Sequence, residues 1–264
     1  MSSAAVTAGP PVAVVAGGAR GIGAATARRL ADSGRTVVVL DALGGSTLGY
    51  PHADAEDLAR LEAHGISGHD VDLRDPGATR AALDAVVAEH GRLDVVVAAA
   101  SVVAGGPLLW EAPAHQLTAL LEADLLTGVH LIQVAVPHLL DRPAEDRPSA
   151  VVITSVAGRQ GLFGLSGYVI AKHAAVGLVR ALAADLAGTA VTAVGVSPGA
   201  TETEMLAATA RIYGLESTAA LAEQQHLRAP MDADEVAQVV ELAATAGPVV
   251  HGAVLDADGG FRRG

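Results

Sequence analysis

Short, continuously apolar runs alternate with longer segments of helical spacing along the chain. The apolar runs, such as residues 12–16 and 36–40, are the pattern of strands buried on both faces of a parallel sheet. Further strands are expected at residues 67–71, 93–98, 149–154, 190–196 and 252–256. Helices are expected at residues 21–33, 55–64, 76–90, 114–140, 164–187, 203–226 and 232–245. The alternation predicts an α/β fold, a doubly wound parallel sheet with helices on both faces.

Nothing in the sequence marks a second domain. Composition does not shift along the 264 residues, and no internal repeat occurs. We therefore expect residues 1–264 to form a single domain, with residues 1–10 flexible.

Composition excludes several classes of protein. The chain has no cysteine, which rules out disulfides and thiol chemistry, and its ten histidines show no metal-ligand spacing. A net charge of -12 without a basic stripe argues against nucleic acid as a partner. The N-terminus does not resemble a signal peptide, and no apolar run is uninterrupted enough to cross a bilayer. These features predict a cytoplasmic protein without a membrane partner or a metal.

A glycine-rich turn joins the first strand to the first helix. Gly17 permits a tight turn, while Gly21 and Gly23 let the helix N-terminus approach a pyrophosphate; Ile22 begins the helix. With the flanking strand and helix, this turn predicts a Rossmann-like dinucleotide site, although glycine-rich turns also occur without a ligand.

The cofactor's ribose has a candidate partner in Asp41, which ends the second strand. A carboxylate there can accept hydrogen bonds from both ribose hydroxyls and would repel a 2′-phosphate, so NAD is favoured over NADP. Arg20 is a weak opposing signal, and Asp41 could instead begin a solvated turn. Asp72 could accept a hydrogen bond from the adenine amino group, or serve only as a turn residue.

Tyr168 and Lys172 are four residues apart in a helical segment, so their side chains share one face. An ammonium beside a phenol favours the phenolate and lowers its pKa. Ser155, at the end of an expected strand, offers a hydroxyl to a substrate oxygen. Such a Tyr–Lys pair is often only solvated surface, but Lys172 is the only lysine among 17 basic residues. A chain that otherwise uses arginine keeps a lysine at the one position where arginine would not be equivalent.

These motifs together resemble the short-chain dehydrogenase/reductase family over nearly the whole chain. The resemblance implies NAD(P)-dependent interconversion of an alcohol and a ketone or aldehyde, with Tyr168 as general acid/base, Lys172 holding the nicotinamide ribose and Ser155 orienting the substrate. Further features of the resemblance are Ser197 and the terminal Asp258-Gly259-Gly260. The cofactor-binding residues it implies are Gly17, Arg20, Gly21, Ile22, Gly23, Asp41, Asp72, Leu73, Ala99, Ala100, Tyr168, Lys172, Pro198, Gly199, Thr201 and Thr203.

A narrower resemblance concerns residues 43–58, a loop longer than the family usually has. With Tyr50-Pro51 in it, this loop is similar to that of the mycofactocin-associated branch. That resemblance implies a tightly held cofactor, covered by the loop at its adenosine end and re-oxidised in place by an external redox carrier. The alternative is a surface loop without a function.

Two features depart from the family pattern. The usual Asn-Asn-Ala-Gly after the fourth strand is here Ala98-Ala99-Ala100-Ser101. The family's asparagine in the long helix corresponds to Asp124, counting back without gaps from Pro137, unless Leu125 occupies that position. If Asp124 lies near Lys172, its charge would raise the pKa of that lysine and make it part of the catalytic group.

The substrate end is expected to be apolar. Residues 203–228 resemble the family's substrate lid, and the pocket residues we expect are Trp110, Val156, Leu162, Phe163, Met205 and Tyr213. The prediction is an NAD-dependent oxidoreductase acting on a small hydrophobic alcohol or ketone, as a homo-oligomer, most simply a tetramer. The alternatives are a cofactor-binding scaffold and a non-redox enzyme on a degraded dehydrogenase fold.

Overall fold

A single parallel sheet forms the centre of the molecule. The computed structural model describes residues 9–261, so most of the segment expected to be flexible, residues 1–8, lies outside the described residues. The sheet runs in the order β5-β2-β1-β6-β7-β8-β9. Its strands are β1 Val12–Ala16, β2 Thr36–Asp41, β5 Ser67–Asp70, β6 Val95–Ala98, β7 Ser149–Ile153, β8 Thr192–Pro198 and β9 Val254–Ala257. The expected Rossmann-like fold is confirmed. From β1 the chain adds strands in one direction, to β2 and β5, and then crosses over to β6 and adds the remaining strands in the other direction, so the strand order reverses between β1 and β6.

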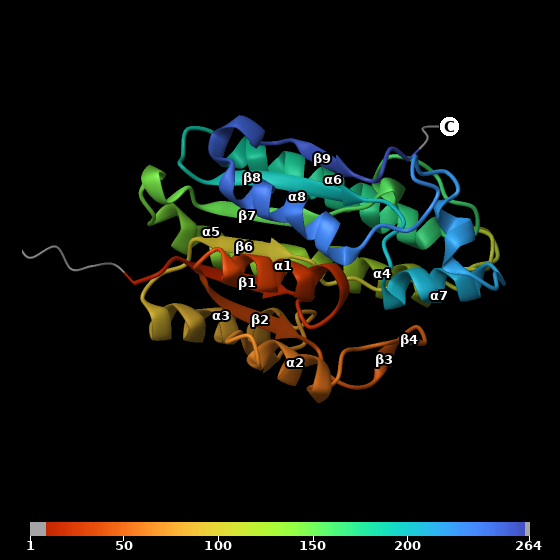
Figure 1. Cartoon of the computed structure of the whole chain (residues 1–264), viewed down its shortest axis with the longest axis horizontal. Coiled ribbons are helices and arrows are strands. Elements are labelled where there is room, and N and C mark those ends of the chain that lie inside the picture. Colours follow the sequence, from red (N-terminus) through yellow and green to blue (C-terminus); the bar gives the residue numbers. More distant parts are fainter. Residues whose placement is uncertain (1–8, 262–264) are drawn as a thin grey trace, which may run out of the picture.

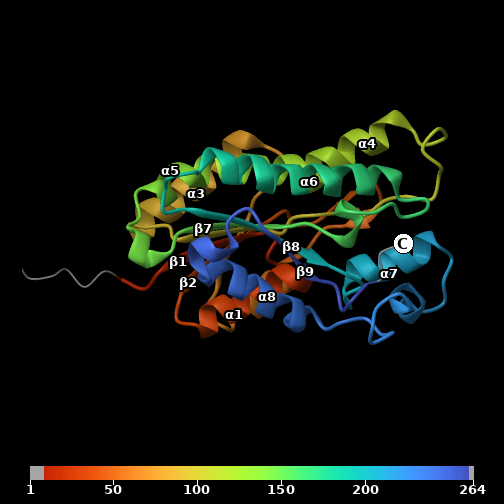
Figure 2. The same ribbon diagram turned by 90° about the horizontal axis from the view of Figure 1, so that it is seen from above.

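Helices cover both faces of this sheet (Figures 1 and 2). They are α1 Gly21–Asp32, α2 Ala55–Glu62, α3 Pro76–His90, α4 Ala114–Leu121, α5 Thr127–Leu140, α6 Ser166–Asp185, α7 Glu204–Ile212 and α8 Ala233–Thr245. One core cluster joins the sheet to α3, α5 and α6, and a second joins the opposite face to α1, α2 and α8. The apolar strands are buried on both sides, as the alternating pattern predicted.

Two elements differ from the sequence prediction. The helix expected at residues 203–226 ends at Ile212, because Gly214 takes a positive φ of 64° and Leu215 N–H closes the end on the carbonyl of Ala210. The chain continues only as a short 3₁₀ turn at Thr218–Ala222.

The long loop after β2 contains a small antiparallel hairpin, β3 Ser46–Thr47 and β4 Tyr50–Pro51. Its two central residues, Leu48 and Gly49, both have positive φ, as a tight hairpin turn requires. Periodicity could not predict strands of two residues. Figure 1 shows the hairpin beyond the end of the sheet, near α2.

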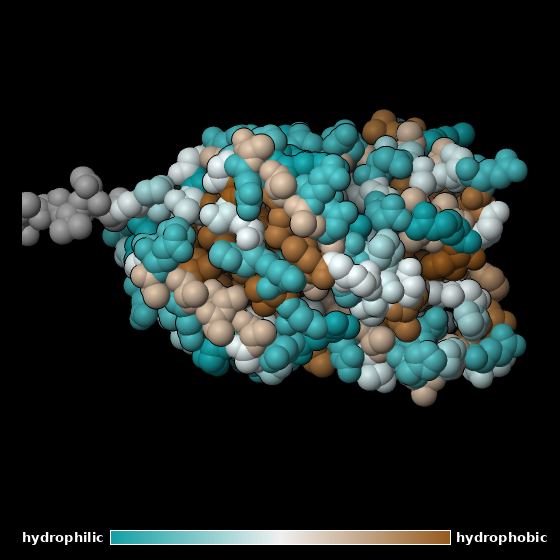
Figure 3. All heavy atoms as spheres, turned by 90° about the horizontal axis from the view of Figure 1, so that it is seen from below, coloured by the Kyte–Doolittle hydropathy of each residue, from teal (hydrophilic) through white to brown (hydrophobic). Residues whose placement is uncertain are grey.

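Two helical stretches, Ala114–Leu140 and Ser166–Asp185, are long and apolar enough to cross a membrane by length and composition alone, contrary to the sequence expectation. The first is uninterrupted because one π-helical turn, η1 Glu122–Leu126, joins α4 to α5. Both stretches pack in the helical layer on the sheet, as apolar core helices do. Hydrophobic side chains on the face in Figure 3 lie in separate groups among hydrophilic ones.

Candidate active site

A cavity of about 840 Å³ opens at the carboxyl ends of the strands. The glycine-rich turn, the hairpin, α7 and the loop after β7 all contribute residues to its lining. Ligands of doubly wound sheets bind at this edge, where the strand order reverses. Most of the residues singled out from the sequence line this one cavity. Those that do not line it include Ala98, Trp110, Asp124, Ser197 and Asp258-Gly259-Gly260.

The glycine-rich turn is packed too closely for larger residues. A Cβ on Gly17 would lie 2.3 Å from the backbone nitrogen of Ala100, and one on Gly23 would lie 2.1 Å from the carbonyl oxygen of Gly17. The first turn of α1 therefore sits directly behind β1. Its N-terminus has no side-chain cap and no acidic residue in its first turn, which leaves the helix dipole free to favour an anion.

Asp41 lines the cavity at the end of β2, as predicted. Its Oδ2 accepts a hydrogen bond of 2.9 Å from the backbone N–H of Ala19. Burial raises the pKa of this carboxyl, and the bond from Ala19 opposes the rise. The carboxylate is thus held in place by the glycine-rich turn itself.

Asp72 lies at the cavity wall but already has a partner. Arg74 donates to both of its oxygens, at 2.8 Å from Nε and 2.7 Å from Nη2, and lowers the pKa of Asp72. The helix that follows is capped by Asp75, not by Asp72. Asp72 is thus held in the turn by Arg74, and both it and the neighbouring buried Leu73 line the cavity wall.

Arg20 reaches from the glycine-rich turn to the hairpin. Its Nη2 donates to the carbonyl of Pro51 at 2.6 Å, its guanidinium lies 5.8 Å from the centre of the Tyr50 ring, and Nε is 3.8 Å from Asp57 of α2. Thr47 and His52 of the same segment hydrogen-bond each other at 2.8 Å. This arrangement fixes the hairpin against the cavity, where Tyr50 packs against the cluster that contains Tyr168. The contact between Arg20 and the hairpin could not be predicted from the sequence.

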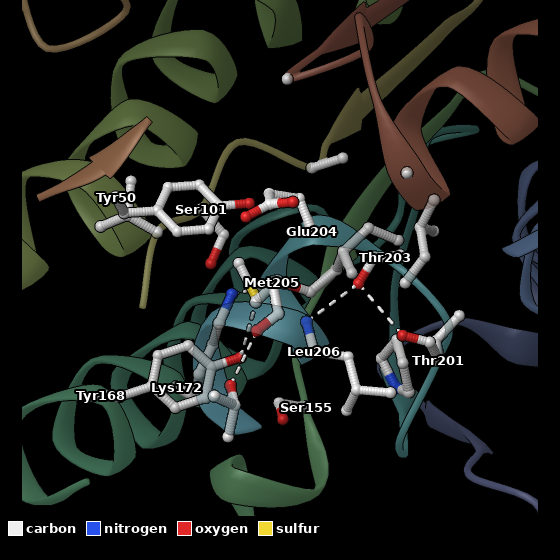
Figure 4. Close-up of a pocket in the computed structure, with 18 of the residues that line it drawn as sticks. Tyr50, Ser101, Ser155, Tyr168, Lys172, Thr201, Thr203, Glu204, Met205 and Leu206 are labelled. Carbon is white, nitrogen blue, oxygen red and sulfur yellow. Dashed lines mark hydrogen bonds between the residues drawn. The ribbon is translucent and has the colours of Figure 1, made fainter. Parts of the chain in front are cut away.

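Tyr168 and Lys172 project into the cavity from one face of α6, with Ser155 nearby (Figure 4). The Tyr168 hydroxyl donates to Met205 Sδ at 3.7 Å, and Lys172 Nζ donates to the carbonyl of Ile153 at 3.5 Å. Lys172 is only 2% exposed, and its Nζ is 5.6 Å from the centre of the Tyr168 ring.

The pKa shifts of Tyr168 and Lys172 differ from the sequence expectation. Burial raises the pKa of Tyr168, and the negative charge of Asp124 raises it further, whereas the Ser155 hydroxyl lowers it. Burial also lowers the pKa of Lys172, which the charge of Asp124 opposes. Loss of solvation at this depth outweighs the attraction that was expected to depress the Tyr168 pKa.

Asp124 lies beside this pair, in the π-helical turn between α4 and α5. It is 6% exposed, and its Oδ1 accepts a hydrogen bond of 2.6 Å from the backbone N–H of Val102. Burial raises its pKa to about 6, and the charge of Lys172 opposes the rise. The structure thus places Asp124 close enough to Lys172 for each charge to affect the pKa of the other group.

The loops after β6 and β8 close the cavity. The N–H of Ala99 donates to the carbonyl of Ala16 at 2.8 Å. This bond holds Ala99 and Ala100, which follow β6, against the glycine-rich turn. After Pro198 and Gly199, the hydroxyl of Thr203 caps α7 by accepting from Leu206 N–H at 3.3 Å and donates to the Thr201 carbonyl at 3.0 Å (Figure 4).

The substrate end matches the prediction in part. Val156, Phe163, Met205 and Tyr213 line the cavity, and Tyr213 donates to the carbonyl of Phe163 at 2.6 Å. Trp110 does not line it and is 80% exposed, because it sits in a tight turn in which Glu111 and Ala112 bond back to Leu108. Lining residues that the sequence prediction did not name include Thr47 and His52 of the hairpin segment. The predicted lid segment, residues 203–228, contributes Glu204, Leu221 and Gln224 to the lining.

Comparison with known proteins identifies the family. The sequence model of the short chain dehydrogenase family matches residues 11–213, more than half of the chain. A cis-4-hydroxycyclohexanecarboxylate dehydrogenase from Sinomonas cyclohexanicum is 34% identical over 260 residues, covering 95% of this chain and 96% of that protein. A (-)-trans-carveol dehydrogenase from Rhodococcus erythropolis is 35% identical over 205 residues, covering 74% of this chain and 72% of that protein.

A solved structure gives the same assignment. Carveol dehydrogenase from Mycobacterium avium, in complex with NAD, superimposes with a TM-score of 0.87 at 30% identity, covering 96% of this chain and 98% of that one. The chain belongs to the short-chain dehydrogenase/reductase family. It is an oxidoreductase of that family.

Proposed function

We propose that this protein is an NAD-dependent dehydrogenase that interconverts a small, hydrophobic, cyclic secondary alcohol and its ketone. The observation that carries the proposal is the meeting of Tyr168, Lys172 and Ser155 in one cavity whose outer end is largely apolar. Relatives named for carveol and for a hydroxycyclohexane carboxylate support the cyclic alcohol.

The residues fit a dinucleotide. The close packing of Gly17 and Gly23 leaves the N-terminus of α1 open to a pyrophosphate, and Asp41 lies at the end of the adjacent strand, where a ribose would be bound. A bound nicotinamide would supply the acceptor or donor of the hydride. NAD-bound neighbours, carveol dehydrogenase among them, support NAD as the cofactor.

The chain's own residues would handle the proton. Tyr168 exchanges it with the substrate oxygen, Ser155 holds that oxygen by its hydroxyl, and Lys172 supplies the positive charge that a phenolate needs in a buried site. Burial also strengthens the electrostatic interaction between Tyr168 and Lys172, because bulk water that would screen their charges is excluded. A panel of cyclic secondary alcohols, assayed by nicotinamide absorbance, tests the activity. Cofactor binding without turnover would favour the scaffold alternative, and product formed without net cofactor change would favour a non-redox reaction.

Cofactor preference gives a test of Asp41. In Asp41→Asn we expect the ratio of kcat/KM for NADP to that for NAD to rise on the order of 10²-fold, because a carboxylate beside a 2′-phosphate costs several kcal/mol. Steady-state kinetics with both cofactors measure it. Asp70→Asn is the matched control, since Asp70 ends the next strand but binds only the N–H of Leu43. An unchanged ratio in Asp41→Asn would show that this carboxylate does not face the ribose.

We also propose that the hairpin holds the cofactor in place, as in the mycofactocin-associated branch, with an external redox carrier as the oxidant. In Arg20→Met we expect NAD to dissociate about tenfold faster, because the charged hydrogen bond to Pro51 and the stacking on Tyr50 are lost. Stopped-flow displacement measures the rate. Arg60→Met is the control, because Arg60 also pairs with Asp57 but lies on the outer side of α2. If NAD dissociated equally fast from the parent, Arg20→Met and Arg60→Met, the hairpin would not be what holds the cofactor.

A further inference from the structure

Two polar atoms are buried without a hydrogen-bond partner beside Tyr168. Among the described residues, the Oγ of Ser101 and the Oδ2 of Asp124 are both in this condition. Buried polar atoms are nearly always bonded, and exceptions cluster where a group moves or a proton is exchanged. Neither atom has a role in the reaction set out above.

The backbone places these two groups next to each other. Ser101 precedes Val102 in the chain, and the N–H of Val102 holds the Oδ1 of Asp124 at 2.6 Å. The second oxygen of the same carboxylate is therefore confined close to Ser101.

The Ser101 hydroxyl lies on the same side of the pocket as Tyr168 and Lys172 in Figure 4. It lowers the pKa of both Asp124 and Tyr168. Ser101 also lines the cavity, and in Figure 4 its hydroxyl points into the pocket on the side of Lys172. It sits apart from Ser155, so Tyr168 has two serine hydroxyls near it.

The charged and titratable groups that face Asp124 come from two elements. From α6, Lys172 stabilises its negative charge, and Tyr168 is affected by that charge in turn. From the hairpin, the pKa of Tyr50 is raised chiefly by burial, and the charge of Asp124 contributes. The carboxylate is thus ionised at neutral pH next to a single cation.

We propose that Ser101 and Asp124 form a proton relay from Tyr168, an inference that rests on the proposed function. In alcohol oxidation the substrate O–H proton passes to the Tyr168 oxygen, the Tyr168 proton passes to Ser101 Oγ, and the Ser101 proton passes to Asp124 Oδ2. The carbinol C–H bond breaks with its electron pair going to the oxidised nicotinamide, and the substrate C–O becomes C=O. The oxygens of Tyr168 and Ser101 each lose one proton and gain another, so both groups end as they began. Asp124 gains one proton and becomes a neutral carboxylic acid.

A carboxylate at this position can do what an amide cannot. An asparagine side chain, which the family usually has here, does not take up a proton near neutral pH, whereas a carboxyl that titrates near pH 6 can take it and release it. Ionisation above this pH leaves Asp124 ready to accept, and protonation below it blocks the relay. The rate of alcohol oxidation therefore falls as the pH drops through about 6.

Kinetics of five variants, one of them a control, test the relay. We expect Asp124→Asn and Ser101→Ala each to lower kcat for alcohol oxidation about tenfold at neutral pH, with little change in KM, and to lose the acid limb near pH 6. The double variant should lose no more than either single variant, because both act on one path. Ser101→Thr keeps the hydroxyl and should restore the parent profile. Glu122→Gln is the control, since it removes an exposed carboxylate from the same turn.

A second measurement does not depend on turnover. Difference infrared spectroscopy, with Asp124→Asn to assign the carboxyl band, should show the pKa of Asp124 rising in Ser101→Ala and unchanged in Ser101→Thr. An active parent whose acid limb survives in both single variants would overturn the relay while leaving the proposed function intact. An inactive parent would overturn the proposed function. An Asp124 pKa that is the same in Ser101→Ala as in the parent would overturn the relay, whether or not the parent is active.

Discussion

Replacing Tyr168 by phenylalanine is expected to lower kcat for alcohol oxidation by about 10³-fold, within the usual range for removing a general acid/base. The variant loses only the hydroxyl, whose single hydrogen bond is the long one to Met205 Sδ, so folding and NAD affinity should change little. Steady-state assays with the preferred alcohol, together with calorimetric titration of NAD, measure the two effects separately.

A matched control for Tyr168 is Tyr213→Phe. Tyr213 also lines the cavity, but its hydroxyl bonds to the Phe163 carbonyl and not to the groups around Lys172. This variant should affect KM more than kcat, because it loosens the end of α7. If Tyr168→Phe retained the parent kcat, another group would have to exchange the proton.

Replacing Lys172 by methionine should lower kcat by about 10²-fold or more and weaken NAD binding as well. Among the described residues, the Lys172 ammonium is the charge that opposes the effect of burial on Asp124, so its loss should raise the pKa of Asp124 further and leave that carboxyl neutral at pH 7. The phenolate form of Tyr168 also loses its nearest cation. Measured kcat, NAD affinity and thermal stability should be compared across pH 5–9.

Lys172→Arg and a double variant separate the causes. Arginine keeps the charge but cannot give up its proton and does not fit the same space, so kcat should remain low. Combining Lys172→Met with Asp124→Asn removes both charges, which should restore thermal stability without restoring kcat. Recovery of kcat in the double variant would mean that Lys172 serves only to balance Asp124.

The sheet was predictable because its strands are buried on both faces, which makes each a continuous apolar run such as residues 12–16 and 36–40. Elements that depend on a few backbone angles could not be predicted in this way. The hairpin depends on the positive φ of Leu48 and Gly49, and the end of α7 depends on Gly214, where the apolar pattern continues beyond the helix.

The residues proposed to act in catalysis were predictable for a different reason. A lone lysine four residues after a tyrosine is a local pattern, and helix geometry alone brings the two side chains together. The contacts of Arg20 with the hairpin and of Asp124 with Val102 join segments far apart in sequence, so no local pattern indicates them. Trp110 was wrongly placed in the pocket because apolar character does not reveal the direction of a side chain in a turn. The tetramer, the cytoplasmic location and the external carrier stay predictions.

Deuterium transfer tests the central claim most directly. Cyclic secondary alcohols carrying deuterium at the carbinol carbon are incubated with the purified protein and NAD, and the reduced nucleotide is analysed by mass spectrometry. The proposed function predicts one deuterium per NADH formed, with the corresponding ketone in equal amount, and almost none with Tyr168→Phe. Bound NAD that gains no deuterium from any alcohol of the panel would contradict it.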